Sequence, residues 1–315
     1  MAAAILSNQE SASPPWPRLD HEAWKTSCAT LHLWTQIVGK IRLAQTPWTN
    51  HSWHVPLYVT ARGLTTSPIP CGARTFQIDF DFIEHLLLIQ ASDGATRTMP
   101  LKARSVADFY RELFAHLAAL GLRIRIHATP NEIADGIPFD QDHQHASYDA
   151  EHVRHFWHAL VQSDRVFKQF RARFIGKCSP VHFFWGSFDL AVTRFSGRPA
   201  PRHPGGVPHC PDWVMREAYS HELSSCGFWP GGEALPYPVF YAYAYPEPPG
   251  FSTADVRPRG ARYEPGFNEF ILPYEEVRLA ASPDALLLEF LQSSYEAAAN
   301  LGSWDRAALE RTLQA

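Results

Sequence analysis

The chain has 315 residues, of which 45% are hydrophobic and 13% aromatic, so it has ample material for a dry core. Its net charge is −4 and only 19% of its residues are charged, which gives no electrostatic case for binding nucleic acid. No apolar run approaches the ~18 residues that a membrane span needs, and the N-terminus lacks the basic stretch of a signal peptide. We therefore expect a cytoplasmic protein whose partner is a small molecule, with no nucleic acid and no membrane, while its oligomeric state stays open.

The chain has 5 cysteines and 16 histidines. The cysteines are scattered and none forms a Cys-x-x-Cys pair, so reduced thiols are expected and neither a zinc ribbon nor a redox motif is supported. Histidine titrates near neutrality and is the commonest metal ligand, so its abundance favours site chemistry.

In chain order, the first half predicts a helix, several strands and a second helix. Residues 1–18 are rich in serine and proline and are expected to be disordered. Apolar residues at helical spacing predict a helix over 24–43, where His32, Gln36 and Lys40 form a polar line on another side. Alternating apolar and polar residues indicate half-buried antiparallel strands. The predicted strands and the helix among them are 54–66, 75–82, 85–91, 96–101, the helix 105–120, and 122–127.

The second half repeats the order of strands followed by a helix. After a loop, the predicted elements are a helix over 150–174, a strand over 181–195, a helix over 214–224, strands over 239–245 and 269–272, and a helix over 283–300. The fold class is therefore α+β, with mainly antiparallel sheets and packed helices. The similar order suggests a degenerate internal duplication of halves 19–150 and 151–310 within one unit, 19–310; two unrelated α+β halves would give a similar pattern.

The segment 181–195 is the most informative one. Both of its faces are mainly apolar, so we expect a central strand that is covered on both sides. His182, Asp189 and Arg194 would then be buried and would need partners. They form either a structural hydrogen-bond network or a site at the end of the strand. Asp189 and Arg194 have opposite parity, so they should not pair with each other.

A second candidate is the segment 217–232. Glu217 and His221 lie four residues apart, so on a helix they would share a face and could bind a metal or act as an acid–base pair. Glu222, next to His221, would point elsewhere. Such a Glu–His pair is far commoner as a surface salt bridge, and no histidine at position 225 completes a zincin motif.

Two further histidine pairs lie elsewhere in the sequence, His51 with His54 and His143 with His145. His54 begins a predicted strand beside a tryptophan and ranks above His143 and His145, which lie in a polar loop. No nucleophile elbow, dinucleotide fingerprint or P-loop occurs, so those classes of enzyme are not supported.

Several long motifs resemble a bacterial family known as domain of unknown function 5996. They are LHLWTQIVGKIRL, RGLTTSPIP, RFIGKCSPVHFFWGSFDLAVTRFSGR, EAYSHELSSCGFWPGG and YAYPEPPGF. The resemblance covers residues 20–310 and implies a single family-wide unit, but no activity. It directs attention to the polar residues in its motifs: His32, Gln36, Lys40, His54, His182, Asp189, Arg194, His221 and Glu222.

The leading hypothesis is an enzyme that acts on a small molecule in an aromatic-lined pocket, by acid–base or metal chemistry. The candidate catalytic residues are His182, His221, Glu222 and Asp189. The candidate substrate-binding residues are His54, Lys40, Gln36, Arg194, Trp185, Trp229, Tyr241 and Tyr243.

The candidate metal ligands are His182, His221 and Glu217. Two histidines and a carboxylate would suit Zn²⁺ or non-haem Fe²⁺. The alternative is a non-catalytic protein that binds a small ligand, in which Lys40, Arg42 or Arg194 holds an acidic group of that ligand.

Overall fold

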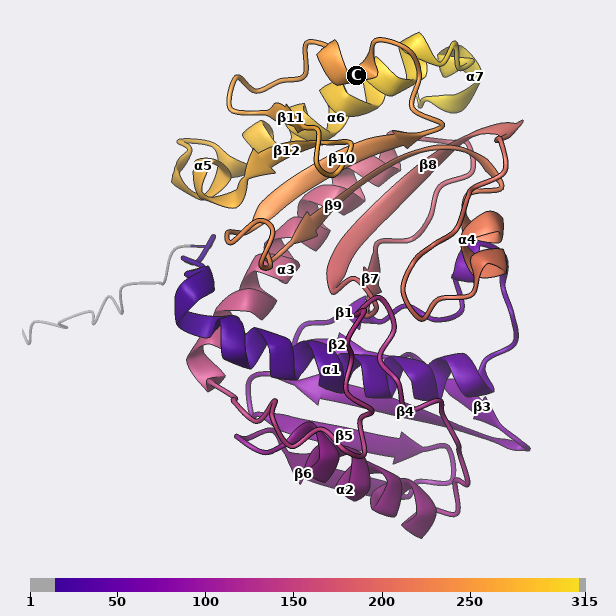
Figure 1. The fold of residues 1–315 in the computed structure, drawn as a ribbon, viewed down its shortest axis with the longest axis vertical. Coiled ribbons are helices and arrows are strands. Elements are labelled where there is room, and N and C mark those ends of the chain that lie inside the picture. Colours follow the sequence, from indigo (N-terminus) through magenta and orange to yellow (C-terminus); the bar gives the residue numbers. More distant parts are fainter. Residues whose placement is uncertain (1–14, 312–315) are drawn as a thin grey trace, which may run out of the picture.

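The computed structural model of the chain describes residues 15–311. Helices accompany two six-stranded antiparallel sheets, which confirms the predicted α+β class. Helix α1 (His21–Gln45) lies between the two sheets (Figure 1). None of the described helices is long and apolar enough to cross a membrane.

The first sheet is a meander built from the N-terminal part of the chain. Its strand order is β1-β2-β4-β5-β6, and β3 pairs with β4. The strands are β1 (Tyr58–Val59), β2 (Gly63–Thr65), β3 (Ile69–Cys71), β4 (Arg74–Asp81), β5 (Leu86–Ala91) and β6 (Thr96–Pro100). Alternate residues of β4, among them Phe76, Ile78 and Phe80, are buried, as the alternation of the sequence predicts. Helix α2 (Val106–Ala119) packs against α1, where the rings of Trp34 and Phe109 stack 4.6 Å apart.

The second sheet has the order β11-β12-β10-β9-β8-β7. Its strands are β7 (His182–Phe184), β8 (Asp189–Pro199), β9 (His221–Trp229), β10 (Val239–Tyr245), β11 (Arg262–Glu264) and β12 (Glu269–Pro273). Helices α3 (Ala150–Ala172) and α6 (Pro283–Leu301) pack on one of its faces. There Phe156 and Phe167 of α3 lie near Phe228 and Phe240 of the sheet.

The opposite face of the second sheet carries polar and aromatic side chains. Because directly paired residues share a face, Ala191, Gly227, Tyr241 and Ile271 form one row across β8, β9, β10 and β12. Side chains two residues away on the same strands share this face. They include Asp189, Trp229, Tyr243 and Glu269.

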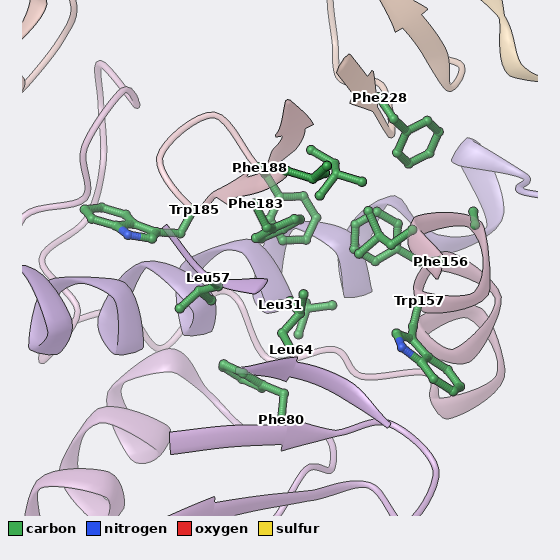
Figure 2. Packing of buried hydrophobic residues seen from close by; sticks show 14 of the residues in the cluster. Leu31, Leu57, Leu64, Phe80, Phe156, Trp157, Phe183, Trp185, Phe188 and Phe228 are labelled. Atoms are coloured by element: carbon green, nitrogen blue, oxygen red, sulfur yellow. The ribbon is translucent and has the colours of Figure 1, made fainter. Parts of the chain in front are cut away.

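A single hydrophobic cluster joins the two sheets. Figure 2 shows Phe80 of the first sheet and Phe228 of the second as members of this cluster, with Leu57 and Phe183 among the residues between them. The backbones of Leu57 and Phe183 exchange two hydrogen bonds of 2.9 Å and so link the segment before β1 to β7. The shorter elements are η1 (Asn50–Ser52), α4 (Asp212–Ala218), η2 (Phe251–Thr253), α5 (Tyr274–Leu279) and α7 (Arg306–Leu309).

The segment 181–195, expected to be one strand, is a hairpin. The chain reverses between β7 and β8, and Phe188 in the turn has a left-handed backbone with φ of 60°. Phe184 therefore pairs with Asp189, which places His182 on the same face as Asp189 rather than on the opposite one. Burial of His182, Asp189 and Arg194 agrees with the sequence prediction.

The helix expected over 214–224 is also different. Helix α4 ends at Ala218, and His221 begins β9, where it pairs with Pro199. Glu217 and His221 therefore do not share a helical face. Both faces of β9 are largely buried, so its sequence lacks the strict alternation that distinguishes a half-buried strand from a helix.

Two other strand predictions are corrected. The segment 122–127 forms no strand: Leu122 and Ile124 are buried as its alternation suggests, but no described strand pairs with it. The segment 54–66 is broken between β1 and β2, because the Thr60 side chain accepts hydrogen bonds from the backbones of Arg62 and Gly63 and closes a turn.

The expected disordered segment 1–18 is described only from residue 15 onward, and residues 1–14 lie outside the described part. Trp16 is only 2% exposed, and its ring lies 5.9 Å from that of Tyr274. The buried side chain of Trp16 thus fixes the segment that leads into α1. The internal duplication stays a prediction.

Candidate functional site

A pocket of about 1430 Å³ lies on the face of the second sheet that α3 and α6 leave uncovered. Its other walls come from the first turns of α1 and from residues within 132–147 and 231–235. The sheet supplies tyrosines from neighbouring positions of β10, because alternate residues of a strand share a face.

Five carboxyl groups line this pocket: Glu132, Glu233 and Glu247 from loops, Asp189 at the start of β8, and Glu269 at the start of β12. Asp189 is buried, Glu269 is half-buried and Glu132 is open to the pocket. Carboxylates that gather in an aromatic pocket are a recurrent feature of sites that transfer protons.

Glu132, Asp189 and Glu269 each stand at or directly after a residue with a left-handed backbone. The φ angles are 63° at Glu132, 60° at Phe188 and 56° at Asn268. For residues other than glycine this conformation costs about 1–3 kcal/mol and clusters at functional sites. The turns that reverse the β7–β8 and β11–β12 hairpins thus also place Asp189 and Glu269 at the pocket wall.

Asp189 is held by hydroxyl groups. Tyr241 and Ser187 each donate a hydrogen bond to its carboxyl group. Burial, followed by the charge of Asp189, raises the pKa of Tyr241 well above its ordinary value, so this phenol keeps its proton and stays a donor. The hydroxyls of Tyr219 and Tyr243 form a second hydrogen bond of 2.9 Å in the same pocket.

The pocket shifts the pKa values of Glu132 and Glu269 toward neutrality. Displacement of water by the surrounding protein, followed by the charge of Asp189, raises the pKa of Glu132 to about 7 and that of Glu269 to about 8. Burial also raises the pKa of Asp189, against the hydrogen bonds from Ser187 and Tyr241, which favour its ionised form.

The polar residues His32, Gln36 and Lys40 of α1 hold two loops by hydrogen bonds to their backbones. A ring nitrogen of His32 donates to the carbonyl oxygen of Gly186 at 2.8 Å, and Lys40 donates to that of Thr129 at 2.6 Å. Burial lowers the pKa of His32 to about 4, so this imidazole is neutral. Gly186 has no side chain where Glu132 approaches, since a Cβ there would lie 2.0 Å from a Glu132 oxygen.

Aromatic rings form the rest of the pocket wall. Trp229 lies 6.3 Å from Phe267, and His203 stacks on Tyr219 at 4.5 Å. Among the described residues that line the pocket, Lys25 is the one lysine and none is an arginine. The wall therefore offers stacking surfaces and acidic groups.

The sequence matches, over residues 16–311, the family described as Family of unknown function (DUF5996). The chain belongs to this family. No curated protein and no solved structure matches it. The matched range contains both sheets and every residue that lines the pocket, so membership of the DUF5996 family extends over the candidate site without assigning it an activity.

In this DUF5996 protein, four of the predicted site residues lie on the wall of one pocket. They are Asp189, Trp229, Tyr241 and Tyr243. Gln36 and Lys40 do not line it but bind the loop that carries Glu132.

The expected metal ligands are not brought together. His182 is fully buried in β7, while the ring of His221 bonds to Ser220, and Glu217 accepts a hydrogen bond from Trp48 at 2.8 Å. Within residues 15–311, no three His, Cys, Asp or Glu side chains are grouped so that they could hold a metal ion. The ligand set failed because it relied on a helix that ends before His221.

The remaining candidates have structural partners outside the pocket. Glu222 accepts hydrogen bonds from Arg198 at 2.6 Å and Ser196 at 2.9 Å. The Trp185 indole donates to the backbone of Val55. The guanidinium of Arg194 lies among the rings of three aromatic residues: Phe170, Phe174 and Tyr295. His54 lies in a separate buried cluster.

The residues of the pocket that sequence reasoning missed include Glu132, Glu269, Tyr219 and His203. Glu132 lies in a loop that was expected to be solvated, and His203 lies in a Gly/Pro-rich loop. The one local signal is the Asn268–Glu269 pair at the start of a strand, since asparagine often adopts the left-handed conformation of a hairpin turn.

Proposed function

We propose that this protein is an enzyme that performs general acid–base catalysis on a small molecule held in the pocket. The observation that carries the proposal is the meeting of Glu132, Asp189 and Glu269 in one aromatic pocket, two of them with pKa values near neutrality. A catalytic acid or base works best when its pKa lies near the operating pH.

The environments of the carboxyls suggest their roles. Glu269, with a pKa of about 8, keeps its proton at neutral pH and is the general acid. Glu132, with a pKa of about 7 and open to water, is the general base. Asp189, fixed by Tyr241 and Ser187, orients the substrate and keeps the other two pKa values raised through its charge.

The composition of the wall limits the substrate. An anionic substrate would meet five acidic groups with Lys25 as the one lysine and no arginine in the described lining, so we propose a neutral or positively charged substrate. Its apolar part would stack on rings such as those of Trp229 and Phe267, and polar groups would bond to the tyrosine hydroxyls.

Carboxyl titration tests the basis of this proposal without a known substrate. Carbon-detected NMR of the glutamate side chains, assigned with Glu132→Gln and Glu269→Gln, should show two carboxyls titrating at about pH 7 and about pH 8. Values near 4.5 for both would remove the basis for assigning them as acid and base.

Turnover tests the function itself. Neutral and cationic polar compounds that raise the melting temperature of the protein would be assayed for conversion by the wild type and by Glu132→Gln, Glu269→Gln and Asp189→Asn. Loss of a general acid or base lowers the rate about 10²–10⁴-fold. The control Glu289→Gln removes an exposed carboxyl on α6 and should leave turnover unchanged. Compounds that bind the pocket but are never converted would favour the non-catalytic binding protein.

A further inference from the structure

A second cluster of polar side chains is buried outside the pocket. It comprises Arg42 near the end of α1, His51 and Ser52 of η1, His54, and His182 of β7. Their exposed fractions are 7%, 5%, 9%, 3% and 0%, respectively. We call these residues the Arg42 cluster. None of them lines the acidic pocket.

Several atoms of the Arg42 cluster have no hydrogen-bond partner among the described residues. They are Arg42 Nε, Ser52 Oγ, His54 Nε2 and both ring nitrogens of His182. A buried polar group that lacks a partner costs about 1–3 kcal/mol, so such groups are almost always satisfied in a working protein. So many together indicate a missing partner.

The fold brings Arg42 and His182 to the ring of the same residue, Tyr58. The bridge between Leu57 and Phe183 sets Tyr58 beside His182, with their rings 5.7 Å apart. The guanidinium of Arg42 lies over the ring of Tyr58 at 5.2 Å. The ring of Trp53, from the segment that carries the other members, is 5.9 Å from His182. After burial, the charge of Arg42 is the next cause that lowers the pKa of His182 to about 3.

The backbone around η1 is strained. His51 and Ser52 are consecutive residues with φ of 58°, a conformation that side chains other than glycine rarely adopt. His51 is held there by two partners: its Nδ1 donates to the Ala218 carbonyl at 3.0 Å, and its Nε2 accepts from Lys177 at 2.6 Å. Strain of this kind is maintained where the surrounding structure requires it, commonly at binding sites.

The charge of the Arg42 cluster is opposite to that of the pocket. It contains a guanidinium, three imidazoles and a hydroxyl, and no carboxylate is a member. Arg42 forms no salt bridge in the described part of the chain; its Nη1 donates to the Pro56 carbonyl. The nearby Glu217 is engaged by Trp48, at the rim.

We propose that the Arg42 cluster binds a small oxyanion, of the carboxylate or phosphate type, between Arg42 and His182. The oxygens of such an anion would accept hydrogen bonds from Arg42 Nε, from an N–H of His182 and from the Ser52 hydroxyl. Its charge would neutralise a buried guanidinium that otherwise has no counter-ion. This site is independent of the acid–base chemistry proposed for the pocket.

The test begins with wild-type protein dialysed free of oxyanions. Its melting temperature would be measured against inorganic phosphate and, separately, acetate, with sodium chloride at equal ionic strength as the reference. A ligand that binds the folded state raises the melting temperature in a saturable way. We expect such a rise with phosphate or acetate, and which of them saturates at the lower concentration identifies the type of anion. No saturable rise with either would overturn the proposal.

Variants locate the effect. Arg42→Met should weaken anion binding about tenfold or more, because it removes the charge. Ser52→Gly should weaken it about fivefold, and it should fold at least as well as the wild type because glycine adopts a positive φ without strain. If Arg42→Met does not fold, Ser52→Gly alone decides the location.

The matched control is Lys40→Met. Lys40 is also a buried cation on α1, 5% exposed, but it donates to Thr129 on the side of the pocket. Its removal should leave the anion effect unchanged. A saturable effect that persists in Ser52→Gly and in folded Arg42→Met, or that disappears in Lys40→Met, would place the anion elsewhere and contradict the proposal.

Discussion

The side-chain amide of Gln36 on α1 holds the backbone of Asn131 by two hydrogen bonds. It accepts one from the Asn131 N–H at 2.8 Å and donates one to the Asn131 carbonyl oxygen at 2.9 Å. Glu132 follows directly, with its left-handed backbone. Because Gln36 is fully buried, a helix between the two sheets fixes the position of a carboxyl in the pocket.

Replacing Gln36 by leucine should therefore both destabilise the protein and disturb Glu132. The substitution keeps the size of the side chain but leaves two backbone groups of Asn131 without partners, at a cost of about 1–3 kcal/mol. The free energy of unfolding in urea measures this loss. Gln45→Leu, near the end of the same helix, is the control and should change stability by less than about 0.5 kcal/mol.

The Gln36→Leu variant also tests whether Gln36 positions the carboxyl of Glu132, because a purely structural role of Gln36 would leave the pKa of Glu132 unchanged. With the loop released, the carboxyl of Glu132 becomes more hydrated, so its pKa should fall from about 7 toward its ordinary value. An unchanged NMR titration of Glu132 in Gln36→Leu would mean that Gln36 stabilises the fold without positioning the carboxyl.

A second prediction concerns pH. The pKa of Glu269 is about 8 in the folded protein and about 4.3 in the unfolded chain. The folded state therefore binds this proton more tightly, and the contribution of Glu269 to stability is full below about pH 4 and is lost as the pH rises through about 8. Replacing Glu269 by glutamine removes this loss of stability at high pH, because glutamine does not ionise.

We therefore expect Glu269→Gln to gain about 1–3 kcal/mol over the wild type between pH 4 and pH 8.5. This is less than the full shift implies, because water in the pocket screens the charge. The free energy of unfolding of both proteins at the two pH values measures the gain. Glu289→Gln, on the exposed side of α6, serves as the control. A difference that does not change with pH would mean that Glu269 is not buried enough to matter.

The sequence predicted what depends on regular periodicity. The alternation in β4 identified its buried face correctly. The apolar residues at helical spacing in α1 are buried too, but the polar Gln36 and Lys40 are also buried because this helix is covered on more than one side. The position of Tyr241 and Tyr243 on one face of β10 also follows from the period of a strand, so two members of the pocket could be named in advance.

The sequence could not show which segments meet. Glu132, Asp189 and Glu269 are far apart in the chain. Asp189 and Glu269 gather through pairing of β8 with β9, of β9 with β10 and of β10 with β12, and Glu132 joins them through the loop that Gln36 holds. The expected metal site failed for a local reason, since a helix of one extra turn was needed to align Glu217 with His221. Turn positions such as Phe188 carry no composition signal, because phenylalanine rarely adopts a positive φ.

A third prediction is that Arg194 stabilises the core of the protein and does not bind a ligand. Its guanidinium lies 3.5 Å from the ring centre of Phe170 and 4.3 Å from that of Tyr295, and it forms no salt bridge in the described part of the chain. Lysine cannot stack in this way, so Arg194→Lys should cost about 2 kcal/mol or more.

Arg194→Met should be less harmful than Arg194→Lys, because it fills the space among the rings without burying a charge. Urea unfolding of both variants gives the comparison. Neither substitution should alter binding in the pocket, because Arg194 lies on the opposite face of the sheet from Asp189. Loss of ligand binding in folded Arg194→Met would return Arg194 to the list of substrate-binding candidates.

The last prediction concerns the contact of α1 with the β7–β8 hairpin, where Figure 2 shows Trp185 over the helix. A Cβ on Gly39 would lie 2.2 Å from a ring carbon of Trp185. Gly39→Ala must therefore push the indole away and weaken its 2.9 Å hydrogen bond to Val55.

Overpacking of this kind costs about 1–3 kcal/mol, which outweighs the gain of about 1 kcal/mol in helix propensity from alanine. We expect Gly39→Ala to lower the free energy of unfolding. Gly266→Ala is the control, since the nearest atom to a Cβ there is 3.8 Å away. In the Trp185→Leu background, Gly39→Ala should lower the free energy of unfolding by less than it does in the wild type. The smaller leucine side chain leaves room for the methyl group. If Gly39→Ala stabilised the protein instead, Trp185 would not rest on α1 at this position.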